Sequence, residues 1–311
     1  MKSGASKAAR EGVMVPEADF ASYYGRPVLH EPVWHTPEIP GYFFLGGLAG
    51  ASSLLALGAQ VTGSRQLATR AKVVAAGAIG LGSVALVRDL GRPERFYNML
   101  RVFKPTSPMS VGSWFLAVYA PAAGVAAATG VFRRFPRIGV LATVVAASVG
   151  PAISTYTAAL LADTAVPAWH EARHELPLVF AGSSALAAGG MGLVLAPSDQ
   201  VGPARRLAFI GAAVELVSLA KLQQRLGPVG EPYATAKGGT YLKAGRALAA
   251  AGLVLNVLGT RRRSLRTGAG AALLAASACT RFGVFEVGRQ SAADPKYTVD
   301  PQRARVDGKS A

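Results

Sequence analysis

Apolar runs of about twenty residues recur along most of this 311-residue chain, and they restrict its fold more than any other feature. A helix needs about 20 mostly apolar residues to cross the hydrocarbon core of a bilayer. The candidate spans are residues 41–62, 70–88, 111–131, 138–162, 175–195, 204–224, 241–260 and 267–287. We therefore predict an all-α integral membrane protein with a bundle of about eight transmembrane helices within residues 41–288.

The composition agrees with a helical membrane protein rather than a nucleic-acid-binding one. Hydrophobic residues make up 51% of the chain and charged residues only 16%, although the net charge is +16. The basic residues lie in short clusters between the apolar runs, as in membrane proteins that follow the positive-inside rule. No DNA- or RNA-binding motif is present, so we expect no nucleic-acid partner.

The distribution of charge between the connections predicts an orientation. The four short connections on one side carry 12 of the 33 basic residues but only one of the 17 acids, Asp199. The positive-inside rule assigns that side to the cytoplasm. We therefore expect a multi-pass protein of the cell (inner) membrane. Its polar tails, residues 1–40 and 289–311, should lie on the outer face with the long loops.

The stretch HEARH, His170 to His174, fits the H-E-x-x-H signature of zinc proteases. Two histidines four residues apart on a helix can share a metal, with the glutamate activating water. An intramembrane zinc metalloprotease is therefore the alternative function. It lacks a second metal motif, and the single Cys279 provides no thiolate cluster. A transporter is a third possibility, but it predicts inverted repeats, and none is evident.

One other charged residue lies in an unusual place. Glu215 falls near the middle of the sixth predicted span. An ionisable group at that depth is energetically costly and is often functional. Glu215 is therefore a candidate for proton transfer, or a protonated or paired group inside the bundle.

The segment DLGRPERFYNMLRVFKPTSPMSVGSW follows the second span. Its Gly and Pro residues predict a turn and then an interfacial amphipathic helix after helix 2. Four basic residues can dock an acidic partner or lipid: Arg92, Arg95, Arg101 and Lys104. Asp89, at the end of the second span, is either a proton-transfer residue or the ion-pair partner of Arg92.

This segment closely resembles one in the NrfD/PsrC (polysulfide-reductase-type) membrane-anchor family. Two other stretches share the resemblance, PGYFFLGGLAGASSLLAL and STYTAALLADTAVPAWHEARHELPLVFAGSSALAAG. The resemblance as a whole covers about residues 35–290. The second of them includes HEARH, which is then a chance match in a loop of the family.

The resemblance implies a quinone-binding anchor subunit of a respiratory oxidoreductase complex, with no haem, iron–sulfur cluster or metal of its own. Such subunits exchange electrons between the quinone pool and a docked ferredoxin-like iron–sulfur subunit. That subunit is linked to a molybdopterin catalytic subunit, here formate dehydrogenase-like or polysulfide/thiosulfate reductase-like. The Ala-, Gly- and Arg-rich sequence is typical of a high-GC bacterium, which favours menaquinone.

The resemblance also implies where the quinone binds, because the family uses polar residues at the start of helix 1 and a tyrosine late in helix 4. Tyr156 lies about 28 Å along the fourth span from Arg137, at ~1.5 Å per residue, and so near the outer end. Tyr42 begins the first span at the same end. We therefore expect the two phenols to meet at one depth.

The start of helix 1 departs from the family pattern. Polysulfide-reductase-type members have Asn and His there, and these positions fall near Ile39 and Tyr42. The polar groups that remain nearby are Glu38, Tyr42 and His35. We expect them to form the quinone site with Tyr156.

A short interfacial helix after the fourth span would place His170 and His174 on one face. There they would either deliver protons to the quinone or help a partner dock.

Overall fold

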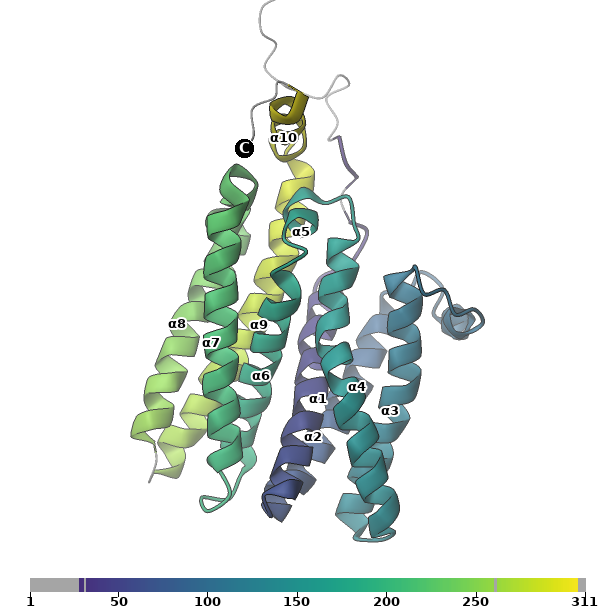
Figure 1. Cartoon of the computed structure of the whole chain (residues 1–311), viewed down its shortest axis with the longest axis vertical. Coiled ribbons are helices and arrows are strands. Elements are labelled where there is room, and N and C mark those ends of the chain that lie inside the picture. Colours follow the sequence, from purple (N-terminus) through teal and green to yellow (C-terminus); the bar gives the residue numbers. More distant parts are fainter. Residues whose placement is uncertain (1–27, 31, 260–261, 307–311) are drawn as a thin grey trace, which may run out of the picture.

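The structure is a computed structural model that describes residues 28–30, 32–259 and 262–306. Within these residues, eight helices are long and apolar enough to cross a membrane (Figure 1). They are α1 (Glu38–Val61), α2 (Arg65–Arg88), α3 (Pro108–Phe132), α4 (Pro136–Ala162), α6 (Leu176–Leu195), α7 (Gly202–Leu226), α8 (Ala236–Leu258) and α9 (Arg263–Ala293). The predicted all-α bundle of eight transmembrane helices is confirmed.

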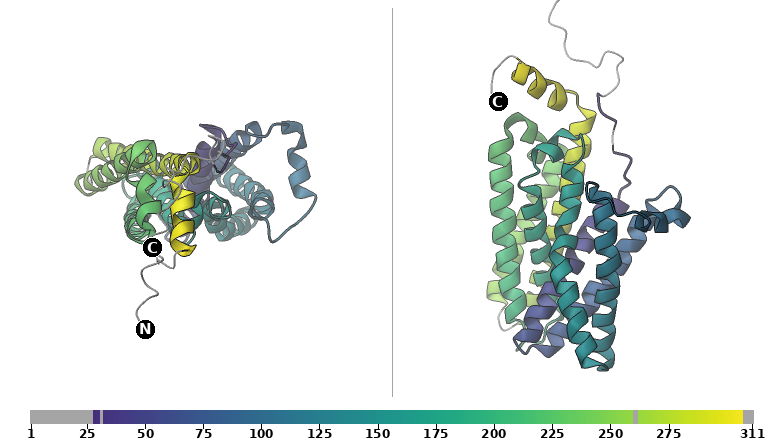
Figure 2. Two further views of the ribbon diagram at one scale, coloured as in Figure 1. Left: turned by 90° about the horizontal axis from the view of Figure 1, so that it is seen from above. Right: turned by 45° about the vertical axis from the view of Figure 1, so that its right-hand side comes forward.

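The shorter helices gather at one end of the bundle, opposite the short connections (Figure 1). They are η1 (Pro93–Leu100), α5 (Pro167–Glu171), η2 (Gly227–Tyr233) and α10 (Lys296–Val306). η1 takes the place of the predicted interfacial helix after helix 2, and it is a 3-10 helix. Figure 2 shows that it projects sideways from the bundle.

The two predicted tails are described only in part. Most of the predicted N-terminal tail, residues 1–27, lies outside the described residues, as do residues 307–311. α9 continues past position 288 to Ala293, and α10 follows it. Lys296 at the start of α10 forms an ion pair of 2.9 Å with Glu231 of η2.

The bundle has two groups of helices joined through its middle. α3 and α4 pack together on one side of α1, while α7, α8 and α9 lie beyond α6 on the other (Figure 2). α1 and α6 are the most deeply buried of the eight spans. Exposed apolar side chains lie on the outer helices, among them Leu81, Leu141 and Ile210. In a membrane these side chains face the lipid.

Small residues let the central helices touch through their backbones. A Cβ atom at Gly50 of α1 would overlap the carbonyl oxygen of Gly150 on α4, and one at Gly150 would overlap Gly50. Between α6 and α7, a Cβ at Gly182 would lie 2.8 Å from the carbonyl oxygen of Gly211. These contacts are typical of helix packing in lipid, where small residues permit close approach.

The turn between α3 and α4 has an unusual backbone. Arg133 and Phe135 both have positive φ, at 54° and 53°. Arg133 caps the C-terminus of α3 in the left-handed conformation that glycine normally supplies. The turn therefore places a basic residue, rather than a glycine, directly at the end of a membrane-spanning helix.

Candidate functional site

The hydroxyl groups of Tyr42 and Tyr156 meet at the end of the bundle that carries the short helices. Tyr42 lies in the second turn of α1 and Tyr156 in the last third of α4. The two hydroxyls are hydrogen-bonded, and the rings are 6.5 Å apart in an edge-on arrangement. Only 2% of Tyr42 is exposed, whereas Tyr156 is half-buried. The structure thus brings together the two phenols that the sequence placed at one depth.

Both tyrosines line a cavity of about 100 Å³ between α1, α2, α3 and α4. Its polar lining consists of the two phenols, Asp89 at the end of α2 and Ser113 of α3. The rest of the lining is largely apolar: Trp34, Ile39, Phe43, Leu86, Leu90, Met99, Met109, Gly112, Leu116 and Leu160. An apolar pocket with a few converging polar groups is the usual form of a small-molecule site.

His35 joins the site through Asp89. The Asp89 carboxylate accepts hydrogen bonds from the backbone N–H of His35, at 3.0 Å, and from its Nδ1 atom, at 2.9 Å. The Asp89 side chain is 11% exposed and that of His35 is 73% exposed. The alternative pairing of Asp89 with Arg92 does not occur in the described structure. Asp89 thus links a buried pocket to a solvent-exposed imidazole.

His35 contacts Asp89 but is not itself part of the cavity lining, and neither is the other predicted binding residue, Glu38. Glu38 is the first residue of α1 and is half-buried. Ile39 and Tyr42 line the cavity instead, since one helical turn separates the residues that share a helix face.

Several lining residues were missed by sequence reasoning. Met99 is the half-buried residue of η1, and Trp34 precedes α1. Trp34 stacks on Trp169, with ring centroids 5.8 Å apart. The spacing of apolar residues along one short segment does not tell which of them folds back onto a distant pocket.

Gly112 of α3 determines where the Tyr156 ring lies. A Cβ atom at Gly112 would overlap Cε2 of Tyr156 and would lie 2.6 Å from its Cδ2. The ring therefore packs directly on the α3 backbone. Any larger residue at position 112 would displace the phenol from the cavity.

An aromatic layer separates the cavity from a buried arginine. Phe43 lines the cavity and packs on Phe180, with ring centroids 6.1 Å apart. The guanidinium carbon of Arg281 lies 3.8 Å from the centroid of the Phe180 ring. Arg281 is fully buried and donates to the carbonyl oxygen of Phe180 and the hydroxyl of Ser184, at 2.7 and 2.6 Å. These acceptors and the ring face compensate for part of the desolvation of the charge, while Nε and the other terminal nitrogen have no hydrogen-bond partner among the described residues.

Glu215 lies deeper in the bundle and does not line the cavity. It is 5% exposed and accepts a hydrogen bond from the Thr280 hydroxyl. Its Oε2 atom has no hydrogen-bond partner within the described residues. The structure therefore places this proton-transfer candidate beside α9, beyond the aromatic layer.

HEARH does not form the helix that a zinc site requires. α5 ends at Glu171, so His170 is helical while His174 lies in the following turn. Both side chains are exposed, and His170 Nδ1 lies 3.0 Å from the carbonyl oxygen of Ala162. Across the described ranges, no three His, Cys, Asp or Glu side chains gather as metal ligands. A short helix does follow the fourth span as expected, but it ends before His174, so the two histidines do not share a helix face.

Trp169 explains why this loop has its shape. Tryptophan is common at membrane interfaces, but this residue is fully buried. Its indole N–H donates to the carbonyl oxygen of Val284 at 2.7 Å, and its ring packs directly on Gly288. Burial of this side chain holds α5 against α9 and leaves the adjacent His170 outside.

An ion pair fixes the other end of the same loop. Arg225 of α7 donates to both carboxylate oxygens of Glu175, at 2.6 and 2.7 Å. These hydrogen bonds hold the pKa of Glu175 below its ordinary value, although partial burial opposes the shift. The bidentate geometry is the favourable one for an arginine and a carboxylate.

The segment that contains η1 is highly exposed. The four predicted docking residues, Arg92, Arg95, Arg101 and Lys104, are all exposed. Large apolar side chains lie between them: Phe96, Tyr97, Val102 and Phe103 are 51–69% exposed. Alternating basic and apolar side chains suit contact with another subunit or with the membrane interface.

Comparison with known families identifies the chain. The model of a family described as "Polysulphide reductase, NrfD" matches residues 27–198, which is more than half of the chain. A search of curated proteins found no match. The family consists of membrane subunits of quinone-linked oxidoreductases, which typically associate with iron–sulfur and molybdopterin subunits. This multi-pass membrane protein, with its phenol-lined cavity at the end of the bundle, belongs to the NrfD family.

Proposed function

We propose that the chain binds a quinone in the cavity between Tyr42 and Tyr156. The observation that carries this proposal is the meeting of the two phenols in a largely apolar cavity beside Asp89. A phenol can both donate and accept a hydrogen bond, so either tyrosine can hold a quinone carbonyl. The apolar lining suits the ring of the quinone.

The cavity is too small for such a ring while the two hydroxyls touch. Its volume of about 100 Å³ lies below the ~300 Å³ at which ligand pockets usually begin. Tyr42 of α1 is almost completely buried, whereas Tyr156 is half-buried. We expect Tyr156 to swing away from Tyr42 when the ring enters, so that each phenol contacts the ligand separately.

The neighbouring residues provide a route for protons. A bound quinone accepts or releases electrons and protons together. Asp89 lines the cavity and contacts His35, which is open to solvent. We propose that Tyr156 exchanges a proton with the quinone oxygen, and that Asp89 and His35 connect the site to solvent. Glu215 remains a second proton-transfer candidate on the far side of Phe43 and Phe180.

The remaining parts of the proposal concern the complex. We propose that a ferredoxin-like iron–sulfur subunit docks on the end that carries η1 and α5, next to the cavity. The exposed basic residues of the η1 segment and the exposed His170 and His174 support this placement. A molybdopterin catalytic subunit, formate dehydrogenase-like or polysulfide/thiosulfate reductase-like, would bind to that iron–sulfur subunit. The charge distribution supports an outer location for this end, and menaquinone is the quinone that we propose.

The decisive experiment replaces Tyr156 by Phe in the assembled complex. Quinone-linked turnover should fall about a hundredfold, the lower end of what a positioned acid–base group contributes. Reduction of an artificial dye by the catalytic subunit should persist, because the dye bypasses the membrane site.

Tyr119→Phe is the matched control. Tyr119 is a buried phenol whose hydroxyl hydrogen-bonds to Ser53 at 2.8 Å, outside the cavity. The Tyr119→Phe variant also loses one phenol hydroxyl, but at a residue that does not line the proposed quinone site. Equal quinone-linked turnover in the two variants would show that Tyr156 does not act on the quinone.

A further inference from the structure

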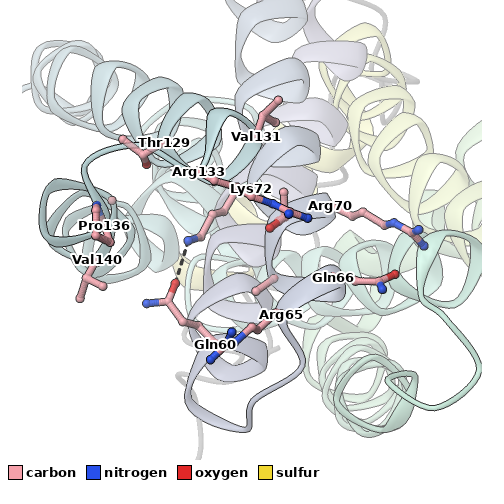
Figure 3. A pocket seen from close by; sticks show the side chains of 14 residues that line it. Gln60, Arg65, Gln66, Arg70, Lys72, Thr129, Val131, Arg133, Pro136 and Val140 are labelled. Atoms are coloured by element: carbon pink, nitrogen blue, oxygen red, sulfur yellow. Dashed lines mark hydrogen bonds between the residues drawn. The ribbon is translucent and has the colours of Figure 1, made fainter.

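A second, larger cavity lies at the opposite end of the bundle. Its volume is about 790 Å³, and it lies where the ends of α1 and α3 meet the starts of α2 and α4. Figure 3 shows the side chains that line it. This is the end with the short connections, opposite the end that carries the short helices and the phenol cavity (Figure 1).

The cavity lining contains four basic residues and no acid: Arg65, Arg70, Lys72 and Arg133. None of the four forms an ion pair with an acid in the described part of the chain. Arg70 extends toward α6 and donates to the carbonyl oxygen of Leu195, so its charge is directed away from the cavity (Figure 3). The other three cations leave the cavity positively charged.

Lys72 is the most informative of these cations. It is only 9% exposed, and its ammonium group has one hydrogen-bond partner, the amide oxygen of Gln60 at 2.7 Å (Figure 3). An ammonium group can donate three hydrogen bonds. A buried ammonium whose partners are a single amide and open cavity is placed to receive an anion.

The depth of the cavity indicates the source of that anion. Lys72 lies seven residues into α2 from Arg65, or about 10 Å along the helix axis. Its side chain reaches to the amide of Gln60 near the end of α1, so the ammonium group lies toward the end of the bundle, where lipid headgroups are expected. Exposed apolar side chains lie beside the cavity wall on α4, where Val140 is 48% and Leu141 is 65% exposed. They offer the acyl chains of a lipid a surface next to its headgroup.

Arg133 adds a further basic group at the rim. Its backbone is in the left-handed conformation with φ of 54°, which residues other than glycine adopt only at an energetic cost. A glycine would be favoured at this C-cap if only the turn mattered. The arginine instead places a guanidinium group, suited to two-point contact with phosphate, across the cavity from α2.

We propose that this cavity binds the phosphodiester headgroup of an anionic phospholipid. Lys72 and Arg133 contact the phosphate, and the acyl chains run along the exposed apolar face of α4. The two cavities share no lining residue, so a failure of the quinone proposal would leave the lipid proposal unaffected. Basic pockets between helices at the cytoplasmic end are suited to such headgroups.

The test measures lipid retention by the purified, detergent-solubilised complex in native mass spectrometry. Phosphatidylglycerol, phosphatidylcholine and inorganic phosphate are added in separate samples. The unaltered protein should retain phosphatidylglycerol in preference to phosphatidylcholine. Lys72→Gln should weaken retention about fivefold, and Lys72→Gln with Arg133→Gln about 25-fold, because each basic group near a lipid phosphate contributes a similar factor.

Two further variants keep the result interpretable. Arg206→Gln removes the same charge from the same end of the bundle, at an exposed residue outside the cavity, and should retain lipid normally. Lys72→Arg keeps the charge and should retain most of the binding, even if Lys72→Gln assembles poorly. The proposal is overturned if Arg206→Gln loses as much lipid as the cavity variants or if Lys72→Arg binds no better than Lys72→Gln. It is also overturned if inorganic phosphate protects the complex from thermal unfolding as well as phosphatidylglycerol does.

Discussion

The crossing of α1 and α4 allows a direct test of how packing positions the two phenols. In Gly50→Ala, the new Cβ would overlap the carbonyl oxygen of Gly150 and would lie 2.5 Å from the Ser154 hydroxyl oxygen. The overlapping atom belongs to the backbone and cannot rotate away. The two helices must therefore move apart at the point where they now touch.

The magnitude follows from two opposing effects. Overpacking in a tight interface costs about 1–3 kcal/mol. Alanine in place of glycine stabilises a helix by up to about 1 kcal/mol. The net loss should be about 1–2 kcal/mol, which corresponds to a drop of roughly 2–8 °C in melting temperature. Gly58→Ala is the control, because nothing lies within 4 Å of its Cβ position on the same helix.

The same variant should also disturb the cavity. Along α1, Gly50 lies about 12 Å from Tyr42, and Gly150 lies about 9 Å from Tyr156 along α4. Separation at the crossing should therefore shift the phenols relative to each other and slow quinone-linked turnover while dye activity survives. Thermal unfolding in detergent and the two activity assays measure both effects. A Gly50→Ala protein as stable and active as Gly58→Ala would show that the backbone contact is unimportant.

Two further predictions concern individual contacts. Gly112→Ala should displace the Tyr156 ring and lower quinone-linked turnover at least tenfold. Gly124→Ala is the control on the same helix, because nothing lies within 4 Å of its Cβ position, and its turnover should be unchanged. Equal turnover in the two variants would contradict this role for position 112. Arg225 lowers the pKa of Glu175, so the pair stabilises the fold above the ordinary pKa of 4.5, and this contribution is lost as pH falls below it. The melting temperature should thus fall more steeply with acid in the unaltered protein than in Glu175→Gln, and parallel curves would refute the coupling.

Hydropathy was sufficient to predict the eight spans, but it placed some helix starts too late. The second span was expected from residue 70, whereas α2 begins at Arg65. Arg65 and Arg70 lie in the first turns, where long basic side chains can reach the polar interface while the helix continues into the membrane. Apolar length therefore underestimates a helix whose ends carry arginine.

The resemblance to the family pointed to the two phenols, and helix length and direction then placed them at one depth, because each lies on a long membrane-spanning helix. The loop around Trp169 could not be predicted, because its conformation depends on contacts with the distant α9. The indole bonds to the backbone of Val284 and rests on Gly288, more than a hundred residues later in the chain. A single sequence carries no signal for such a pairing, and H-E-x-x-H therefore suggested a helix through His174, whereas α5 ends at Glu171.

All residues that line the phenol cavity fall between Trp34 and Leu160, ahead of α5 and all later helices in the chain. Helices α7, α8 and α9 contribute none of them. They contact the site only indirectly, because α7 and α9 pack against α1 and α6, and α8 packs against α9. Because synthesis and insertion proceed from the N-terminus, every wall of the cavity is in the membrane before these three helices have been made. The lining of the phenol cavity is thus complete before α7, α8 and α9 have been made, and these helices pack onto a bundle that already contains it.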